Sequence, residues 1–275
     1  MPEGPEIRRA ADRIEQAIAG PLIEDVQFAF EHLQPYESEL IGQRVLEVET
    51  RGKAMLTHFD NGLSIYSHNQ LYGVWMIRPK GHFPQTRRQL RLAIHGDEKM
   101  ALLYSASSIE VLGQEGIKNH SFLRGIGPDV MNKATQKQTL KRRLSKQLEK
   151  HKRRRLCGLL LDQKVVCGIG NYLRSEILFL AGVHPSQRPV DCTESQLKLL
   201  AKLMISVPEQ AYKTGGITND LKRAETLKAQ GAPKSQYRHW VFGRKNQSCY
   251  SCGETIIKST FAGRRCYYCP TCQNG

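Results

Sequence analysis

The sequence has no long hydrophobic run, since no stretch approaches the roughly 18 apolar residues that a membrane-spanning helix needs. Its first residues carry two acids and no apolar stretch, which excludes a secretory signal, and they are not Arg- and Ser-rich like a transit peptide. We therefore expect a cytoplasmic protein with reduced cysteines. In such a protein eight cysteines indicate metal binding rather than disulfides.

Acidic residues are few beside the basic ones. The chain has 41 Lys and Arg against 26 Asp and Glu, a formal charge of +15, and residues 133–155 alone hold 11 of these cations and one Glu. A concentrated basic segment suits a polyanion such as nucleic acid. A solvated, charged linker is the alternative, and the few apolar residues of the segment give no deep hydrophobic face for a membrane surface.

The N-terminal half predicts one helix followed by β-structure. Four apolar residues share one face of the first 20 residues, with a proline in the first turn and Gly20 at the stop. They are Ile7, Ala11, Ile14 and Ile18. Short alternating or apolar runs then fill residues 22–112, and the turns at 60–62 and 96–99 predict hairpins.

The C-terminal half predicts helices and then a cysteine-rich end. Residues 113–150 are expected to form a loop that passes into the basic stretch, and residues 151–212 have a helical pattern. Residues 235–275 are polar, aromatic and rich in cysteine.

Two C-x-x-C pairs, 249–252 and 269–272, are separated by 16 residues. Four thiolates on two tight turns can close a tetrahedral zinc site, and four protein ligands make such a site structural. A redox dithiol is the alternative for one pair alone. Cys266 also competes as a ligand, but it lies in a predicted strand. We therefore assign one zinc ion to Cys249, Cys252, Cys269 and Cys272.

Between these pairs, "TIIKSTFAGRRC" predicts a hairpin that turns at "AG" and carries Arg264 and Arg265 at or near its tip. A metal-stapled hairpin holds an arginine rigidly toward a phosphate. Upstream, "GIGN" at 168–171 predicts a tight turn followed by a new helix. Free amides at that helix N-terminus would bind phosphate, with Asn171 as a further donor.

The opening "MPEGPE" also has a chemical reading. If Met1 is removed, Pro2 presents a secondary amine, and an N-terminal amine with a pKa near ~8 is partly neutral at pH 7. Such an amine attacks a sugar carbon to form an iminium. The helix dipole lowers the pKa of this amine and the carboxylates of Glu3 and Glu6 raise it, so the net direction stays open. The structural alternative is a simple helix cap.

Together these stretches resemble the formamidopyrimidine-DNA glycosylase and endonuclease VIII superfamily, most closely the bacterial endonuclease VIII branch. The motifs "PEGPE", "ETRGKA", "HNQLYG", "GPDV" and "GIGNYLRSEIL" and the cysteine hairpin occur in the family order over essentially the whole chain. The resemblance implies an α+β multidomain fold. Its parts are an N-terminal helix with an antiparallel β-sandwich, a helix–two-turns–helix domain and a β-hairpin zinc finger.

The resemblance also implies a bifunctional DNA glycosylase and AP lyase that removes oxidised pyrimidines from damaged duplex DNA and nicks the strand by β,δ-elimination. Pro2 matches the Schiff-base nucleophile, Glu3 the acid that helps open the sugar ring, and Glu6 a supporting residue. Lys53 matches the proton donor in β-elimination. Arg264, by its distance from the third cysteine, matches the phosphate-gripping arginine that assists δ-elimination.

DNA-binding roles follow in the same way. Gln70, Leu71 and Tyr72 match the wedge that fills the gap left by the extruded base, and Asn171 matches the phosphate-gripping residue. Arg124 stands one place earlier than the second phosphate arginine of the family, which puts its role in doubt.

The expected domains are a catalytic domain, a basic linker, a helix–two-turns–helix domain and a zinc finger, at residues 1–130, 131–150, 151–234 and 235–275. We expect a monomer in the bacterial cytoplasm, associated with the nucleoid when bound to DNA. Two alternatives remain: an oxidised-purine glycosylase, and a non-catalytic zinc DNA-binding protein, which would leave Pro2, Glu3 and Lys53 unexplained.

Overall fold

The computed structural model describes residues 2–132 and 135–274, and these form two compact units. The first unit takes in Pro2 and Glu6–Gly125, and the second takes in Glu3–Pro5 and residues 126–274. Met1, on whose removal the expected Pro2 amine depends, and residues 133 and 134 of the basic segment lie outside the described residues. Each unit is described by itself.

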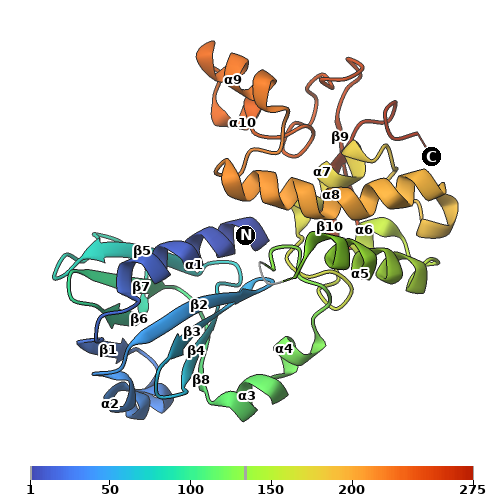
Figure 1. The fold of residues 1–275 in the computed structure, drawn as a ribbon. Coiled ribbons are helices and arrows are strands. Elements are labelled where there is room, and N and C mark those ends of the chain that lie inside the picture. The colour runs from blue at the N-terminus through green and yellow to red at the C-terminus, as the bar shows by residue number, and fades with distance from the viewer. Residues whose placement is uncertain (1, 133–134, 275) are drawn as a thin grey trace. The chain divides into compact units, whose positions relative to one another are not determined.

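Two four-stranded antiparallel sheets make up most of the first unit (Figure 1). One has the order β1-β6-β7-β5 and the other β2-β3-β4-β8. Their bounds are β1 Asp25–Phe28, β2 Val45–Arg51, β3 Ala54–Phe59, β4 Ser64–His68, β5 Val74–Pro79, β6 Leu90–His95, β7 Lys99–Tyr104 and β8 Ser108–Leu112. Both predicted hairpin turns are confirmed, at 60–62 between β3 and β4 and at 96–98 between β6 and β7.

Apolar side chains of both sheets and of α1 (Gly4–Ile18) share one core. The four residues predicted to share a helix face, from Ile7 to Ile18, are each at most 2% exposed. Val48 and Phe59 enter this core from one sheet and Leu92 and Ile94 from the other. Because alternate strand residues point to opposite faces, this is the core of a β-sandwich.

Short helices complete the first unit. They are η1 Glu31–Tyr36, α2 Glu37–Leu40, α3 Gln114–Asn119 and α4 Ser121–Gly125. The last two fall where the sequence predicted a loop.

The loop predicted over residues 113–150 is therefore wrong, and the largest difference is α5 (Lys137–Lys150). Leu140, Leu144 and Leu148 recur every four residues, which places them on one face of this helix, and all three are buried. Because lysines and arginines far outnumber these three leucines, the sequence of this segment does not clearly indicate a buried helix face. The basic residues lie on a helix that packs against α8 (Glu194–Lys213).

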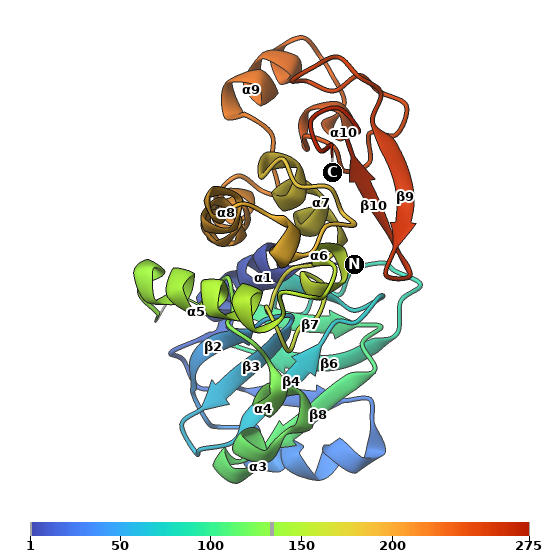
Figure 2. The ribbon, with the colours of Figure 1, turned by 90° about the vertical axis from the view of Figure 1, so that its right-hand side faces the viewer.

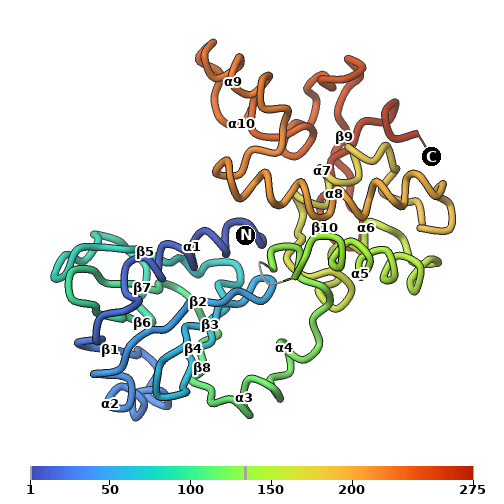
Figure 3. The backbone as a smooth tube through the Cα atoms, in the orientation of Figure 1, coloured from blue at the N-terminus to red at the C-terminus, as the bar shows by residue number. Residues whose placement is uncertain are grey.

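The second unit is helical up to its cysteine-rich end, and Figure 3 traces its path from α5 to α8. Besides α5 and α8 it contains α6 Leu156–Leu159, α7 Asn171–Leu180, η2 Pro189–Asp191, α9 Leu221–Ala229 and α10 Lys234–Tyr237. The hairpin β9 (Ile257–Phe261) and β10 (Arg264–Tyr268) follows, and β10 lies against α7 (Figure 2).

No helix in the described ranges 2–132 and 135–274 is both long and apolar enough to cross a membrane.

Candidate active site and metal centre

The carboxylate of Glu3 lies on the N-terminal amides of α7. Glu3 is 4% exposed, and its Oε2 accepts a hydrogen bond from the Gly170 amide at 2.7 Å. Its Oε1 accepts from the Tyr172 amide at 2.9 Å, and the Leu173 amide lies 3.3 Å from Oε2. A helix N-terminus leaves amides without intrahelical partners and favours negative charge. Glu3 thus supplies the acceptor for these amides.

This arrangement corrects the prediction for the "GIGN" turn. The sequence assigned free amides at the start of α7 to phosphate binding, but three of the amides there donate to Glu3. The glycines are needed for a different reason. A Cβ on Gly170 would lie 2.4 Å from the Glu3 carboxylate, and Gly168 has a φ of +94°. The turn is shaped to admit a carboxylate.

A backbone bond adds to this attachment. The amide of Gly4 donates to the carbonyl of Gly168 at 2.8 Å. Pro2, the predicted nucleophile, directly precedes Glu3 and is half-buried, and Glu6 in α1 lies 3.5 Å from Arg9. The two residues that follow Pro2 are thus both fixed by hydrogen bonds to the segment 168–173.

Asn171 is the first residue of α7, as predicted. Its Oδ1 is buried and has no hydrogen-bond partner among the residues that the structure describes. The side-chain oxygen of this predicted phosphate-binding residue is therefore buried from solvent.

Lys53 lies in the β2–β3 turn of the first unit and is only 9% exposed. Its charge acts on His68, the last residue of β4. The pKa of His68 is lowered, first by burial and then by the Lys53 ammonium. A neutral His68 can accept a hydrogen bond on a ring nitrogen.

The predicted wedge loop, residues 70–72, depends on that acceptor. The amide of Gln70 donates to Nδ1 of His68 at 3.0 Å, and Gln70 adopts a φ of +48°. The Gln70 Oε1 accepts from the Ser107 hydroxyl at 2.7 Å. Leu71 and Tyr72 at the tip are 62% and 70% exposed. Two large apolar side chains thus project from a loop that is held at its base.

Arg124, at a position shifted by one from the second phosphate arginine of the family, is exposed in the last turn of α4. Its backbone amide donates to the carbonyl of His120.

Arg264 is the first residue of β10, opposite Phe261, and it is exposed, as is Arg265. The two turn residues between the strands, Ala262 and Gly263, both have positive φ (51° and 70°), as a tight type I′ hairpin turn requires. The predicted hairpin and the position of its two arginines are confirmed.

A buried arginine, which the sequence reading missed, holds that turn. Arg174 of α7 is 0% exposed and donates to the carbonyls of Arg265 at 2.9 Å, Arg264 at 3.3 Å and Phe261 at 3.2 Å. A fourth bond goes to the carbonyl of Cys157 at 3.0 Å. One guanidinium therefore fixes the base of the turn that presents Arg264. An arginine within the apolar pattern of α7 was the available signal.

Glu176, also on α7, holds the chain where it enters the cysteine-rich end. The side chain is 0% exposed and accepts from the amides of Trp240, Val241 and Phe242 at 2.8 to 2.9 Å and from the Thr218 hydroxyl at 2.6 Å. Burial raises the pKa of Glu176, while these four donors act in the opposite direction.

Four cysteines form a cluster with the geometry of a metal centre. The Sγ atoms of Cys249, Cys252, Cys269 and Cys272 all lie within 4.8 Å of one another. Backbone amides of Ser251 and Cys272 each lie 3.4 Å from a cluster sulfur, the arrangement that tight C-x-x-C turns produce. This four-cysteine cluster can hold a metal ion.

Cys266 lies outside that cluster. It is 0% exposed, and its Sγ lies 3.5 Å from the Ser175 hydroxyl of α7. Its side chain therefore packs at the contact of β10 with α7.

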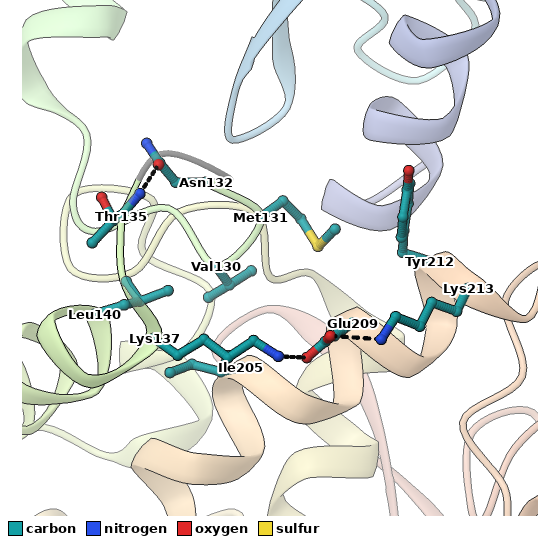
Figure 4. Close-up of a pocket in the computed structure, with 10 residues that line it drawn as sticks. All are labelled: Val130, Met131, Asn132, Thr135, Lys137, Leu140, Ile205, Glu209, Tyr212 and Lys213. Atoms are coloured by element: carbon teal, nitrogen blue, oxygen red, sulfur yellow. Dashed lines mark hydrogen bonds and ion pairs between the residues drawn. The ribbon is translucent and has the colours of Figure 1, made fainter.

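A separate cavity of about 210 Å³ in the second unit has a mainly apolar wall, including Met131, Leu140 and Ile205 (Figure 4). Its acid, Glu209, is 2.6 Å from Lys137 and 2.8 Å from Lys213, and these two cations lower the pKa of Glu209. The charged groups of this cavity are thus paired with one another.

Acid should loosen the wedge loop. Because the fold lowers the pKa of His68 below 6.5, the folded loop binds a proton less readily than the open chain, so its stability falls as the pH drops below about 6.5. We expect hydrogen-exchange protection of the Gln70 amide to fall between pH 7 and ~5, after correction for intrinsic exchange. The Leu63 amide, whose acceptor is the non-titrating Asn61 side chain, is the internal control. Equal changes at both amides would contradict the role of His68.

Two family models match the chain. The formamidopyrimidine-DNA glycosylase N-terminal domain matches residues 1–106, and the formamidopyrimidine-DNA glycosylase H2TH domain matches residues 126–223. Together they cover most of the sequence, on either side of the boundary between the two units.

Full-length relatives agree. Endonuclease 8 of Salmonella arizonae is 46% identical over 273 residues, 99% of this chain and 100% of the relative. Endonuclease 8 of Klebsiella pneumoniae is 45% identical over 274 residues, with all of both chains covered.

The fold also matches solved structures. A Lactococcus lactis formamidopyrimidine-DNA glycosylase in complex with DNA that contains an oxidised pyrimidine aligns with a TM-score of 0.80 at 22% identity, over 100% of each chain. The same enzyme bound to DNA with an AP site aligns with a TM-score of 0.79. At this identity the likeness establishes the fold alone, and it confirms the predicted fold class. By its family models and its full-length relatives, the chain belongs to the endonuclease 8 and formamidopyrimidine-DNA glycosylase family of DNA glycosylases with AP lyase activity.

Proposed function

We propose that this protein removes oxidised pyrimidines from duplex DNA through an iminium on Pro2 and then cuts the strand by β,δ-elimination. The observation that carries the proposal is the carboxylate of Glu3. It follows the proline directly and is held by amides of α7 at 2.7 and 2.9 Å. A nucleophile beside a carboxylate of fixed position is the arrangement that covalent catalysis uses.

The first step forms a covalent bond. The Pro2 nitrogen attacks C1′ of the damaged nucleotide, the base leaves, and the sugar ring opens to an iminium. A secondary amine gives this cation without a further proton. The attacking nitrogen gives its proton to the Glu3 carboxylate, and Glu3 delivers that proton to the ring oxygen as the bond from C1′ to the ring oxygen breaks. The ionised Glu3 also offsets the positive charge that develops on the sugar and the nitrogen.

The later steps break the strand. The iminium acidifies the C2′ proton, and its loss expels the 3′-phosphate, with Lys53 in the role of proton donor. A second elimination expels the 5′-phosphate. The side chain of Arg264, at the end of the turn that Arg174 fixes, is proposed to bind the phosphate at this stage.

DNA binding draws on both units. Gln70, Leu71 and Tyr72 are proposed to fill the gap left by the extruded base, and Asn171 is proposed to contact phosphate. The exposed Arg124 is proposed to contact a phosphate, and the half-buried Glu6 is proposed to support Glu3.

The four-cysteine cluster is proposed to hold one structural Zn²⁺. Four thiolates at this mutual distance suit zinc, and a closed set of four ligands leaves no position for a catalytic water. When bound, the ion would cross-link the two C-x-x-C segments that flank the β9–β10 hairpin. We further propose that the protein is a monomer of the bacterial cytoplasm that acts on damaged double-stranded DNA. The bacterial origin of the relatives and the damaged DNA bound in the similar solved structures support the last part of this proposal.

A second candidate substrate is an oxidised purine, because the similar solved structures are formamidopyrimidine-DNA glycosylases. Matched duplexes, one with an oxidised pyrimidine and one with an oxidised guanine, separate the two. We expect faster cleavage of the pyrimidine duplex.

Blocking the N-terminal amine should abolish the chemistry. A residue added ahead of Pro2 turns its nitrogen into an amide without a free lone pair, while the Glu3 bonds to α7 can persist. With borohydride and a lesion duplex, we expect the protein with a free Pro2 to be trapped covalently and the extended one not to be. Both should bind the duplex. The proposal fails if the extended protein excises the base at the normal rate, or if the adduct maps to Lys53.

The metal assignment makes a paired prediction. Elemental analysis should find about one Zn per chain, Cys272→Ser should lose it, and Cys266→Ser should keep it, because the Cys266 sulfur faces Ser175 instead of the cluster. Both replacements remove one thiol from the same segment, so each is a control for the other. The opposite pattern would overturn the ligand set.

A further inference from the structure

The exposed face of α5 carries a concentrated positive charge. Arg142, Lys146 and Lys150 follow one another at intervals of four residues, which places them on one face of the helix. Arg143 precedes Lys146 by three residues and borders the same face. All four residues are exposed. These four residues are called the α5 basic face below.

This face points away from the core of the second unit. The helix packs against α8 through a different stripe, formed by Leu140, Leu144 and Leu148, which are buried in the main core cluster of that unit. On a helix with 3.6 residues per turn, Lys146 lies about 160° around the axis from Leu144. The α5 basic face therefore meets solvent.

The charge of this face is not neutralised within the part of the chain that the structure describes. None of its four cations forms an ion pair with a described residue. The one acid of α5, Glu149, is 3.0 Å from Lys152. The lysine at the start of the helix, Lys137, is 2.6 Å from Glu209. The neighbouring carboxylates thus bind other lysines, and the four charges of the face are available to a partner.

These charges work against the helix that carries them. Like charges four residues apart on a helix repel each other, and Lys146 has such a neighbour on each side. The first turn of α5 contains no acid to complement the helix dipole, and Gln136 makes no side-chain capping bond. The leucine stripe therefore holds α5 in place, while the α5 basic face adds a repulsion that a polyanion would offset.

The α5 basic face is separate from the proposed phosphate contact of the same unit. Figure 2 shows α6 and α7 between α5 and the turn of the β9–β10 hairpin, which carries Arg264 at the start of β10. A duplex segment on the hairpin turn therefore leaves the α5 basic face open to another segment.

We propose that the α5 basic face binds the phosphate backbone of a second, undamaged segment of duplex DNA. The choice of DNA as the polyanion rests on the proposed function. The four cations span eight residues, or ~12 Å at ~1.5 Å per residue. A duplex presents one phosphate charge per ~1.7 Å of its axis, so ~7 charges face this length. Contacts to phosphate carry no sequence information, so this surface would hold the protein on intact DNA independently of a lesion.

The binding of two duplexes by one protein tests this surface. A short duplex with an abasic-site analogue first fills the lesion site in a 1:1 complex, and a labelled undamaged duplex is then titrated by fluorescence anisotropy. At about 50 mM salt we expect the second duplex to bind with a Kd of ~10⁻⁴ M or below. In Arg142→Gln/Lys146→Gln this affinity should fall on the order of tenfold, and its salt slope by up to ~1.8, at ~0.9 per lost contact.

Lys198→Gln/Lys202→Gln is the matched control. These two lysines are also exposed and four residues apart, but they lie on α8, so the variant loses the same formal charge outside the α5 basic face. Its affinity for the second duplex should stay within about twofold of that of the unchanged protein. Equal losses in the two variants, or no second duplex bound at ~10⁻⁴ M, would overturn the proposal.

Two other results would assign the face differently. If Arg142→Gln/Lys146→Gln weakens the abasic duplex instead of the second duplex, the face contacts the lesion-bearing segment and the proposal fails. If a single-stranded RNA binds the face and duplex DNA does not, the partner is RNA and the proposal also fails.

Fold and chemistry serve as internal checks on the α5 variant. Its unfolding temperature should equal or exceed that of the unchanged protein, because a like-charge pair is removed, and a clear decrease would make the two cations structural and overturn the assignment. Borohydride trapping on a short lesion duplex should be unchanged. Failure of this surface and failure of the Pro2 chemistry are therefore distinguishable.

Discussion

The bond between the Glu3 carboxylate and the first amides of α7 is the constraint on which the proposed chemistry depends. A chain terminus is ordinarily mobile because little holds it. Here two hydrogen bonds of 2.7 and 2.9 Å from the amides of Gly170 and Tyr172 to Glu3, together with the bond from the Gly4 amide to the Gly168 carbonyl at 2.8 Å, fix the residues that directly follow Pro2. The glycines at 168 and 170 are what make room for this contact. A nucleophile at the end of a chain can then have a defined position without a side chain of its own to pack.

The same helix fixes the other part of the second unit that matters for DNA. Arg174 binds carbonyls on both sides of the hairpin turn, and Glu176 binds three successive amides from Trp240 to Phe242. Buried charges are costly unless hydrogen bonds satisfy them, and removal of either partner leaves the other unsatisfied. The charged side chains of α7 therefore define where the cysteine-rich end attaches. The four-cysteine cluster can rigidify that end further when it holds a metal.

Much of the fold could be predicted from local rules. The apolar face of α1, the two hairpin turns and the start of α7 at Asn171 follow from spacing and turn chemistry. The leucine stripe of α5 was hidden by its charged neighbours, since its three buried residues fill only one narrow face. The partner of the α7 amides could not be read from sequence at all, because Glu3 precedes that helix by 168 residues. An arginine within the apolar pattern of α7 marked Arg174 as unusual, but its partners could not be predicted, because they are backbone carbonyls about 90 residues away that no sequence pattern marks.

The most direct test of this account is the separation of base removal from strand cleavage in Glu3→Gln. The amide keeps an oxygen for the α7 amides but removes the negative charge. Glu6→Gln serves for comparison, because Glu6 is a half-buried carboxylate three residues along the chain whose proposed role is only to support Glu3, so its loss of base excision should be smaller. The account predicts that Glu3→Gln loses base excision from an oxidised-pyrimidine duplex by ~10² or more and still cleaves a pre-formed abasic site, where the aldehyde is already available to Pro2. Normal base excision by Glu3→Gln, or a larger loss in Glu6→Gln, would contradict it.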